Sequence, residues 1–180
     1  MRRLAPTRAR RRSLAGDDSG AAAVEFALVV PLLLLIVFGI INFGVLFSQQ
    51  VSINNAVREG ARRAVVGDPS APRTCDGILA SVRNELSGLA LNPADVQIKV
   101  TQDWGTGSDS NGCGSAFVLA SFGANAGKVP CKGSYDATTN TARSLIVEAK
   151  LVSTIPVSFP PFPTTITLTS KAVYRCEFSV

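Results

Sequence analysis

The sequence predicts an α+β protein: a long N-terminal helix that crosses a membrane, then a small domain of one helix on a three-stranded antiparallel sheet with disulfides. Three observations predict this fold. An apolar run fills residues 26–41, three later segments alternate apolar and polar side chains, and all four cysteines lie downstream of the run. Such a run is typical of a membrane helix, and alternation is typical of half-buried strands. An even number of cysteines is typical of an extracytoplasmic domain with disulfides.

The composition excludes several classes of protein. The 180 residues include no histidine, so catalytic triads, Cys-His nucleophiles and His-ligated metal sites are all absent. There is also no CxxC motif for a Cys₄ zinc site and no complete phosphate-binding or calcium-binding loop. The sequence therefore predicts a protein that is not an enzyme, carries no cofactor or metal, and has no small-molecule substrate.

The apolar run is long enough to span a bilayer. Residues 26–41 contain no polar side chain, and after Asn42 the run resumes as far as Phe47. Twenty-two residues make about 33 Å of α-helix, close to the hydrocarbon thickness of about 30 Å. Pro31 lies inside the run, where a membrane helix tolerates it, usually as a kink. We expect residues 26–47 to cross the membrane once.

The helix is expected to continue beyond the membrane. Ile53, Val57 and Ala61 recur at helical spacing, with polar side chains elsewhere around the cylinder. Gly67 and the proline after it then end the pattern. One helix from about Ala22 to Val66 would therefore lie half in lipid and half outside it.

The net charge of +5 is concentrated ahead of the apolar run. Residues 1–20 contain six arginines and two aspartates, a balance of +4, which leaves +1 for the rest of the chain. A short basic arm beside an apolar helix indicates orientation rather than nucleic-acid binding. We expect a basic cytoplasmic leader over residues 1–20, a transmembrane and juxtamembrane helix over residues 21–66, and an extracytoplasmic α+β domain over residues 67–180, anchored in the inner membrane.

Four segments build the predicted extracytoplasmic domain. Residues 76–91 place apolar side chains on one side of a helix, and residues 95–104, 144–154 and 164–178 alternate as strands do. The connection 155–163 contains four prolines and cannot donate to the interior of a sheet. We therefore expect one helix packed on three antiparallel strands.

The cysteines predict two disulfides. Residues 105–143 are too long for a structureless loop in a compact domain, and they contain Cys113 and Cys131. A bridge between these two would close a loop of about 19 residues and stabilise the domain by roughly 3 kcal/mol. Cys75 would then pair with Cys176. Three connectivities are possible, and this one is our expectation.

Glu25 lies at the start of the apolar run, where a carboxylate is costly in a bilayer. One interpretation is that it marks the helix start, because acidic side chains complement the positive end of the helix dipole. A second interpretation comes from its neighbours. The stretch GAAAVEF, residues 20–26, resembles the processing site of type IV pilins, where a prepilin peptidase cuts after the glycine.

This resemblance implies roles for four residues. Cutting between Gly20 and Ala21 removes the basic arm and makes Glu25 the fifth residue of the mature chain, followed by the aromatic Phe26. The new α-ammonium of Ala21 would lie one helical turn from Glu25, where opposite charges partly compensate. In a filament, the same carboxylate would meet a neighbour's amino terminus and set the register between helices.

The residues that follow narrow the resemblance to one family. The apolar helix, followed by NNAVREGAR at residues 54–62, resembles TadE-like proteins, which are minor pilin-like subunits of tight-adherence (Flp-type) pilus systems. The resemblance covers residues 16–66. It implies a pseudopilin that assembles through its N-terminal helix, with the membrane, a prepilin peptidase, other pilin-like subunits and the pilus assembly platform as partners. Independently of the resemblance, the local basic arm and the scattered Trp104, Tyr135 and Tyr174 predict no nucleic-acid partner.

Two other interpretations compete with this one. The first is a single-pass membrane protein with an extracytoplasmic interaction domain unrelated to pili. The second is a cleaved secretory signal peptide, which is disfavoured because the small residues Ala21–Ala23 precede the apolar run rather than follow it.

Overall fold

The computed structural model describes residues 18–66, 74–88, 91–103, 112–131, 135–136, 141–157 and 164–176. The chain divides into two compact units, Met1–Ile41 and Asn42–Val180, and each is described by itself. We call the second one the head unit. The arginines of the basic leader lie outside the described residues.

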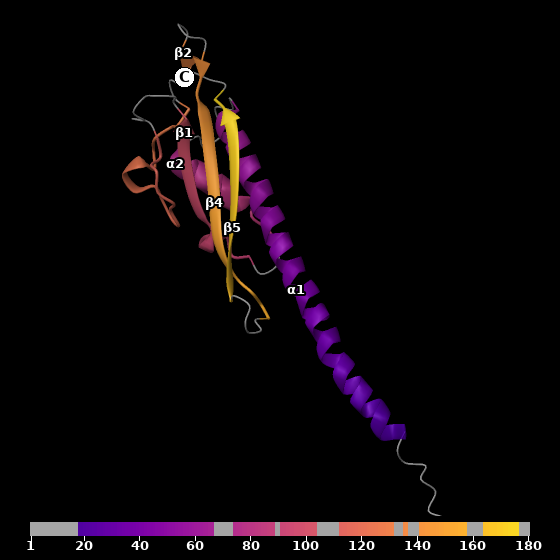
Figure 1. Ribbon diagram of the computed structural model, residues 1–180. Helices are drawn as coiled ribbons and strands as arrows, with labels where there is room; N and C mark the ends of the chain where they lie inside the picture. The colour runs from indigo at the N-terminus through magenta and orange to yellow at the C-terminus, as the bar shows by residue number, and fades with distance from the viewer. Residues whose placement is uncertain are drawn as a thin grey trace, which may run out of the picture. The chain divides into compact units, whose positions relative to one another are not determined.

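A single helix, α1, carries the apolar run. It extends from Asp18 to Val65 and includes Pro31, and it begins four residues ahead of the predicted start. Arg62 and Arg63 occupy its last turn, where basic side chains offset the negative end of the helix dipole. The long N-terminal apolar helix predicted from the sequence is confirmed (Figure 1).

The head unit contains a three-stranded sheet. Its strands are β1 (Gln97–Asp103), β4 (Ser144–Thr154) and β5 (Thr165–Arg175), in the order β1-β4-β5. Both neighbouring pairs are antiparallel. This confirms the predicted sheet, and β4 has the bounds that its alternating pattern predicts. Two shorter strands, β2 (Tyr135–Asp136) and β3 (Thr141–Ala142), form a separate antiparallel pair.

The second helix, α2, extends from Cys75 to Asn84 and is shorter than the predicted 76–91. Thr74 caps its start, because the threonine Oγ1 accepts a hydrogen bond from the Gly77 N–H at 3.1 Å. Beyond the helix, the Ser87 N–H donates to Ser52 Oγ on α1 at 2.8 Å. In a longer helix the Ser87 N–H would donate to a carbonyl one turn earlier in α2. Here it donates to Ser52 on α1 instead, and α2 ends early.

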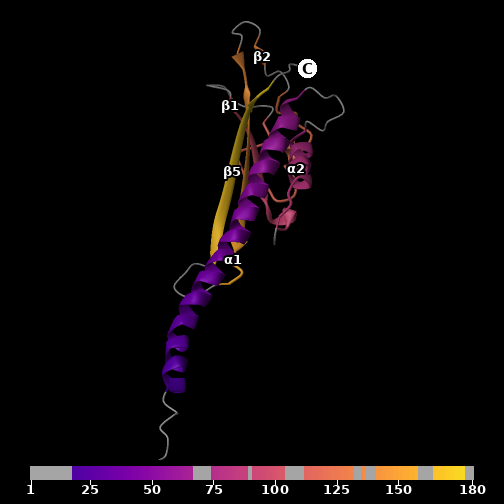
Figure 2. The same ribbon diagram turned by 90° about the vertical axis from the view of Figure 1, so that its right-hand side faces the viewer.

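The core of the head unit lies between the helices and one face of the sheet. Figure 2 shows α2 and the part of α1 that belongs to the head unit on the same side of the sheet. The strands alternate as predicted, since one row of side chains is buried and the next is not. The largest fully buried aliphatic side chains are those of Ile53, Val57, Ile78, Val82, Val96, Ile98, Val100, Leu145 and Val147.

The opposite face of the sheet carries charged side chains together with the exposed Val152 and Val173. Lys99, Glu148 and Lys171 are direct cross-strand neighbours on β1, β4 and β5. Glu148 pairs with Lys99, and its second carboxylate oxygen lies 3.8 Å from the Lys171 ammonium. Opposite charges placed opposite each other in this way stabilise a sheet modestly.

The disulfide pairing differs from the one expected. Cys75 is bonded to Cys113 and Cys131 to Cys176, so the predicted Cys113–Cys131 and Cys75–Cys176 pairs are wrong. Two disulfides are present, as predicted, and none of the four cysteines is free. The closed loops have separations of 38 and 45 residues. Each doubling of loop length costs only about 0.6 kcal/mol, so sequence proximity is a weak guide to pairing.

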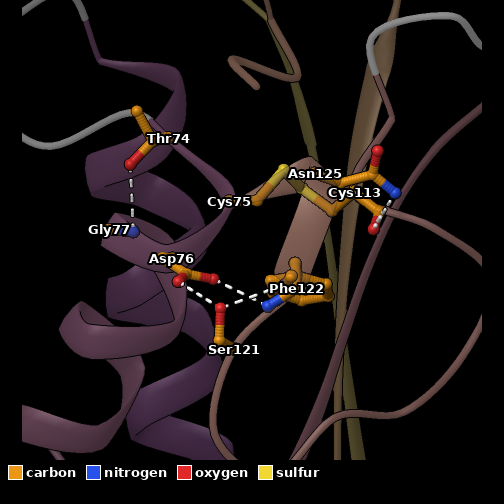
Figure 3. The surroundings of a disulfide bond; sticks show 9 residues. Thr74, Cys75, Asp76, Gly77, Cys113, Ser121, Phe122 and Asn125 are labelled. Atoms are coloured by element: carbon orange, nitrogen blue, oxygen red, sulfur yellow. Dashed lines mark hydrogen bonds between the residues drawn. A yellow bond between two sulfur atoms is a disulfide. The ribbon is translucent and has the colours of Figure 1, made fainter. Parts of the chain in front are cut away.

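The hydrogen bonds around Cys75 explain the observed pairing. The Asp76 carboxylate accepts from the Phe122 N–H at 2.8 Å and from Ser121 Oγ at 2.6 Å, which fixes this loop at the start of α2 (Figure 3). Asn125 Nδ2 donates to the Cys113 carbonyl at 3.2 Å. Residues 112–131 therefore lie against α2 and bring Cys113, rather than Cys176, to Cys75.

Candidate assembly helix

The four residues with predicted processing and assembly roles all lie on α1. Gly20 and Ala21 are the third and fourth residues of the helix, and Glu25 and Phe26 follow about one turn later. All four are exposed, Phe26 by 70%. Glu25 lies seven residues after Asp18, where α1 begins. In the unprocessed chain it therefore does not belong to the first turn of the helix, as one interpretation of the sequence had it.

Glu25 has no oppositely charged partner in the part of the chain that the structure describes. Among the described residues, no arginine, lysine or polar side chain forms an ion pair or hydrogen bond with its carboxylate. An uncompensated carboxylate beside sixteen apolar residues is costly in a bilayer. The chain as described therefore leaves Glu25 available to an amino terminus or another cation.

The apolar part of α1 is exposed all round. From Gly20 to Ile41, no described side chain is buried, and the helix is long and apolar enough to cross a membrane. A helix that is apolar on every face needs an apolar environment on every face, either lipid or other helices. The exposed large side chains include those of Val24, Leu28, Val29, Leu32, Leu33, Leu34, Leu35, Ile36, Val37, Phe38, Ile40 and Ile41.

Within the head unit, α1 is attached to the sheet by polar side chains. Gln49 is 2% exposed, and its Oε1 accepts a hydrogen bond from the buried Ser153 Oγ at 2.6 Å. Gln50 Nε2 donates to the Thr169 carbonyl on the edge strand β5 at 3.0 Å. A buried polar side chain is costly unless it is hydrogen-bonded, and the Gln49 side chain is.

Asn42 makes the most specific of these attachments. Its Nδ2 donates to the Val157 carbonyl at 2.8 Å, and its Oδ1 accepts from the Val157 N–H at 3.2 Å. The side-chain amide thus pairs with the backbone as a neighbouring strand would. In the sequence Asn42 was only an interruption of the apolar run, and nothing there indicated its partner 115 residues away.

The end of α1 carries a cluster of charges. Glu59 pairs with Arg62 at 3.0 Å and with Arg63 at 2.8 Å, and Arg63 also reaches Glu85, just beyond α2, at 2.8 Å. The hydrogen bond from Arg62 and then that from Arg63 lower the pKa of Glu59 below its ordinary value of 4.5. The hydrogen bonds from Glu59 in turn raise the pKa values of both arginines.

This cluster predicts a loss of stability in acid. Because the pKa of Glu59 is lower in the folded head than in the unfolded chain, its contribution is present above its ordinary value of 4.5 and is lost as the pH falls through the folded value. We expect Glu59→Gln to lower stability near neutral pH and to flatten part of the acid slope. Denaturant titrations of the full chain in detergent between about pH 3 and pH 7 measure this. An acid slope identical to that of the wild type would contradict it.

The described residues contain no grouping of three or more His, Cys, Asp or Glu side chains placed to hold a metal ion. The described residues instead provide an exposed apolar helix, a carboxylate near its start with no partner among them, and a disulfide-bonded head. These features suit association with lipid and with other apolar helices.

Comparison with known families gives one match, and it lies on α1. Residues 20–62 match the family described as TadE-like protein. No curated protein and no solved structure matches the chain. The matched segment contains Gly20, Ala21, Glu25 and Phe26, the residues on which the resemblance in the sequence rested. The match confirms that resemblance over this part of α1, which is similar to the TadE-like family.

Proposed function

We propose that this chain is a pseudopilin of a tight-adherence (Flp-type) pilus system, a structural subunit rather than an enzyme. The coarser statement is already supported, since the TadE-like helix and its exposed apolar surface fit a membrane protein associated with such a pilus. One observation carries the proposal. The family match begins at Gly20 and covers the apolar segment, which no described residue buries.

A prepilin peptidase would cut between Gly20 and Ala21. The family match starts at this glycine, and both residues are exposed. A Cβ placed on Gly20 would meet none of the described residues within 4 Å, so their packing does not require the glycine. Recognition by a protease is a reason for a glycine where the fold itself gives none.

The basic leader would lie in the cytoplasm and the head unit outside the inner membrane. Arginines directly ahead of an apolar helix favour this orientation. The two disulfides support it, because disulfides persist in oxidising compartments and are rare in the cytosol. The partners that follow are the lipid bilayer, the peptidase, other pilin-like subunits and the assembly platform.

Glu25 would direct assembly. After processing, the amino terminus of Ala21 lies one turn away on the same helix, and the amino terminus of a neighbouring subunit is an equivalent cation. Opposite charges meeting between apolar helices gain more than they would in water, because the surroundings have a low dielectric constant. The carboxylate would thereby select one register among many that apolar contacts alone allow.

The register role is tested by Glu25→Gln, which keeps the shape and removes the charge. We expect the variant to enter the membrane fraction normally but to be depleted several-fold from pili sheared off the cell. Immunoblots of the two fractions measure this. Asp18→Asn is the matched control, because it removes a nearby acid that leaves with the leader, and it should change neither fraction. Equal recovery of Glu25→Gln and wild type in pili would contradict the role of Glu25.

A further inference from the structure

Asn42 stands where the apolar run meets the head unit. It directly follows sixteen residues without a polar side chain, and it is the first residue of the head unit. Both polar atoms of its side chain bond to the backbone of Val157, three residues beyond the end of β4. At this one residue, the chain changes from a segment that requires an apolar environment to one that is bonded to the head.

This bond limits how far α1 enters the hydrocarbon. Exposed polar groups are costly at membrane depth, where they have no water to bind. Asn42 satisfies both backbone groups of Val157, but Thr154 and Thr164 at the same end of the sheet are exposed. Val157 lies outside β4 and is only partly buried. If Asn42 lay within the hydrocarbon, this segment would have to lie there too.

From these contacts we propose that the head unit rests directly on the bilayer surface, with the hydrocarbon ending at Ile41 and the Asn42–Val157 pair at the lipid headgroups. The inference rests on the membrane anchoring that belongs to the proposed function. It replaces the sequence-based span of residues 26–47 with a span that ends six residues earlier.

The free side of α1 just above Ile41 suits the headgroup region. Phe43 and Phe47 are 69% and 60% exposed, and their rings stack with centroids 6.0 Å apart. Phe47 lies about 9 Å along the helix from Ile41, and helical side chains lean toward the N-terminus, which here is the membrane side. Gln49, by contrast, is buried against the head. The side of α1 that carries Phe43 and Phe47 is therefore free to contact lipid headgroups. The side that carries Gln49 packs against the rest of the head unit.

The new span changes the position of the processing site. Counting about 30 Å, or 20 residues, back from Ile41 puts the inner edge of the hydrocarbon at Ala22. Gly20 and Ala21 then lie at the cytoplasmic boundary, and Glu25 lies about 4–5 Å inside it. With the span 26–47, Glu25 would have stayed outside the hydrocarbon. The head-side bond of Asn42 thus sets the depth of the carboxylate at the opposite end of the span.

Depth-dependent fluorescence quenching tests this placement in the full chain. Single cysteines at Ile41, Phe47 or Asn55 carry a thiol-reactive fluorophore, which is specific because no native cysteine is free. The variants are placed in phosphatidylcholine and phosphatidylglycerol vesicles with nitroxide on the headgroup or on the acyl chain. We expect stronger quenching from the acyl chain at Ile41, stronger quenching from the headgroup at Phe47, and little of either at Asn55.

Three results would overturn the proposal. Acyl-chain quenching at Phe47 equal to that at Ile41 would extend the span to Phe47. Self-quenching at Phe47 without lipid quenching would show a second copy covering this face. No quenching at Ile41 would mean that the helix is not in the bilayer, and the anchoring in the proposed function would fall as well. Only the third result touches the proposed function.

A second variant isolates the Asn42 bond. A fluorophore at Pro156→Cys, an exposed position beside Val157, should be quenched by headgroup nitroxide. Asn42→Leu cannot pair with the Val157 backbone, so we expect this quenching to fall at least twofold. Asn55→Leu on the same helix is the control and should leave it unchanged. Quenching at Pro156 that is absent in the wild-type background, or equal in Asn42→Leu, would contradict the placement by Asn42.

Discussion

Replacing Cys75 and Cys113 together by alanine is expected to destabilise the head unit by about 4 kcal/mol. The bond joins residues separated by 38 positions, and closing a loop of that length removes much of the freedom of the unfolded chain. Removing Cys131 and Cys176, separated by 45, should cost about the same. Pulse proteolysis of the full chain in detergent across a denaturant series measures the free energy of unfolding.

Thiol counting in the same variants tests the pairing itself. With Cys75–Cys113 and Cys131–Cys176 bonded, Cys75→Ala/Cys113→Ala leaves one intact bond and no free thiol. The matched control Cys113→Ala/Cys131→Ala breaks both bonds and leaves two free thiols. If unreduced Cys113→Ala/Cys131→Ala contained no free thiol, the observed pairing would be wrong. The Cys113–Cys131 pairing predicted from the sequence would then be correct.

Gly60→Ala is expected to destabilise the head unit by about 1–3 kcal/mol, although alanine favours a helix by about 1 kcal/mol over glycine. A Cβ at Gly60 would lie 2.4 Å from Val82 Cγ2 and 3.3 Å from the Val82 Cα on α2. Val82 is fully buried and branched at Cβ, so it has little freedom to move aside. The two helices would have to separate, and the core beneath them would loosen.

Gly44→Ala is the control on the same helix. A Cβ there meets none of the described residues within 4 Å, so the helix preference decides the effect and stability should hold or rise slightly. The same proteolysis assay compares the two variants. If Gly60→Ala proved as stable as Gly44→Ala, α1 and α2 would not approach as closely as the structure shows.

The fold could be predicted because the elements are amphipathic or wholly apolar. The alternation of Leu145, Val147, Ala149 and Leu151 specified β4 to the residue, since each apolar side chain proved to be buried. The run from Phe26 specified α1 because a single segment in lipid can satisfy its own backbone hydrogen bonds only as a helix. These patterns lie within single segments of the sequence, and the packing of the folded protein agrees with them.

Features decided by contacts between distant residues could not be predicted. The cysteine pairing depends on Asp76 binding the loop at Phe122, and the end of α2 depends on Ser52 binding the Ser87 N–H. The hydrogen bonds between Asn42 and Val157 could not be predicted either, because no sequence pattern around a single asparagine indicates which distant backbone group it binds. Glu25 and Gly20 were found by resemblance, and the family match over residues 20–62 supports the resemblance rather than the roles.

The most direct test of the proposed function is the N-terminus of the mature protein, determined by mass spectrometry from cells with and without the prepilin peptidase. We predict a chain that begins at Ala21 when the peptidase is present and retains residues 1–20 when it is absent. Gly20→Val should remain unprocessed, whereas Gly16→Val, a glycine four residues upstream, should be cut normally. A wild-type protein that keeps its N-terminal arm in the presence of the peptidase would contradict the pilin role and favour a plain membrane-anchored interaction domain.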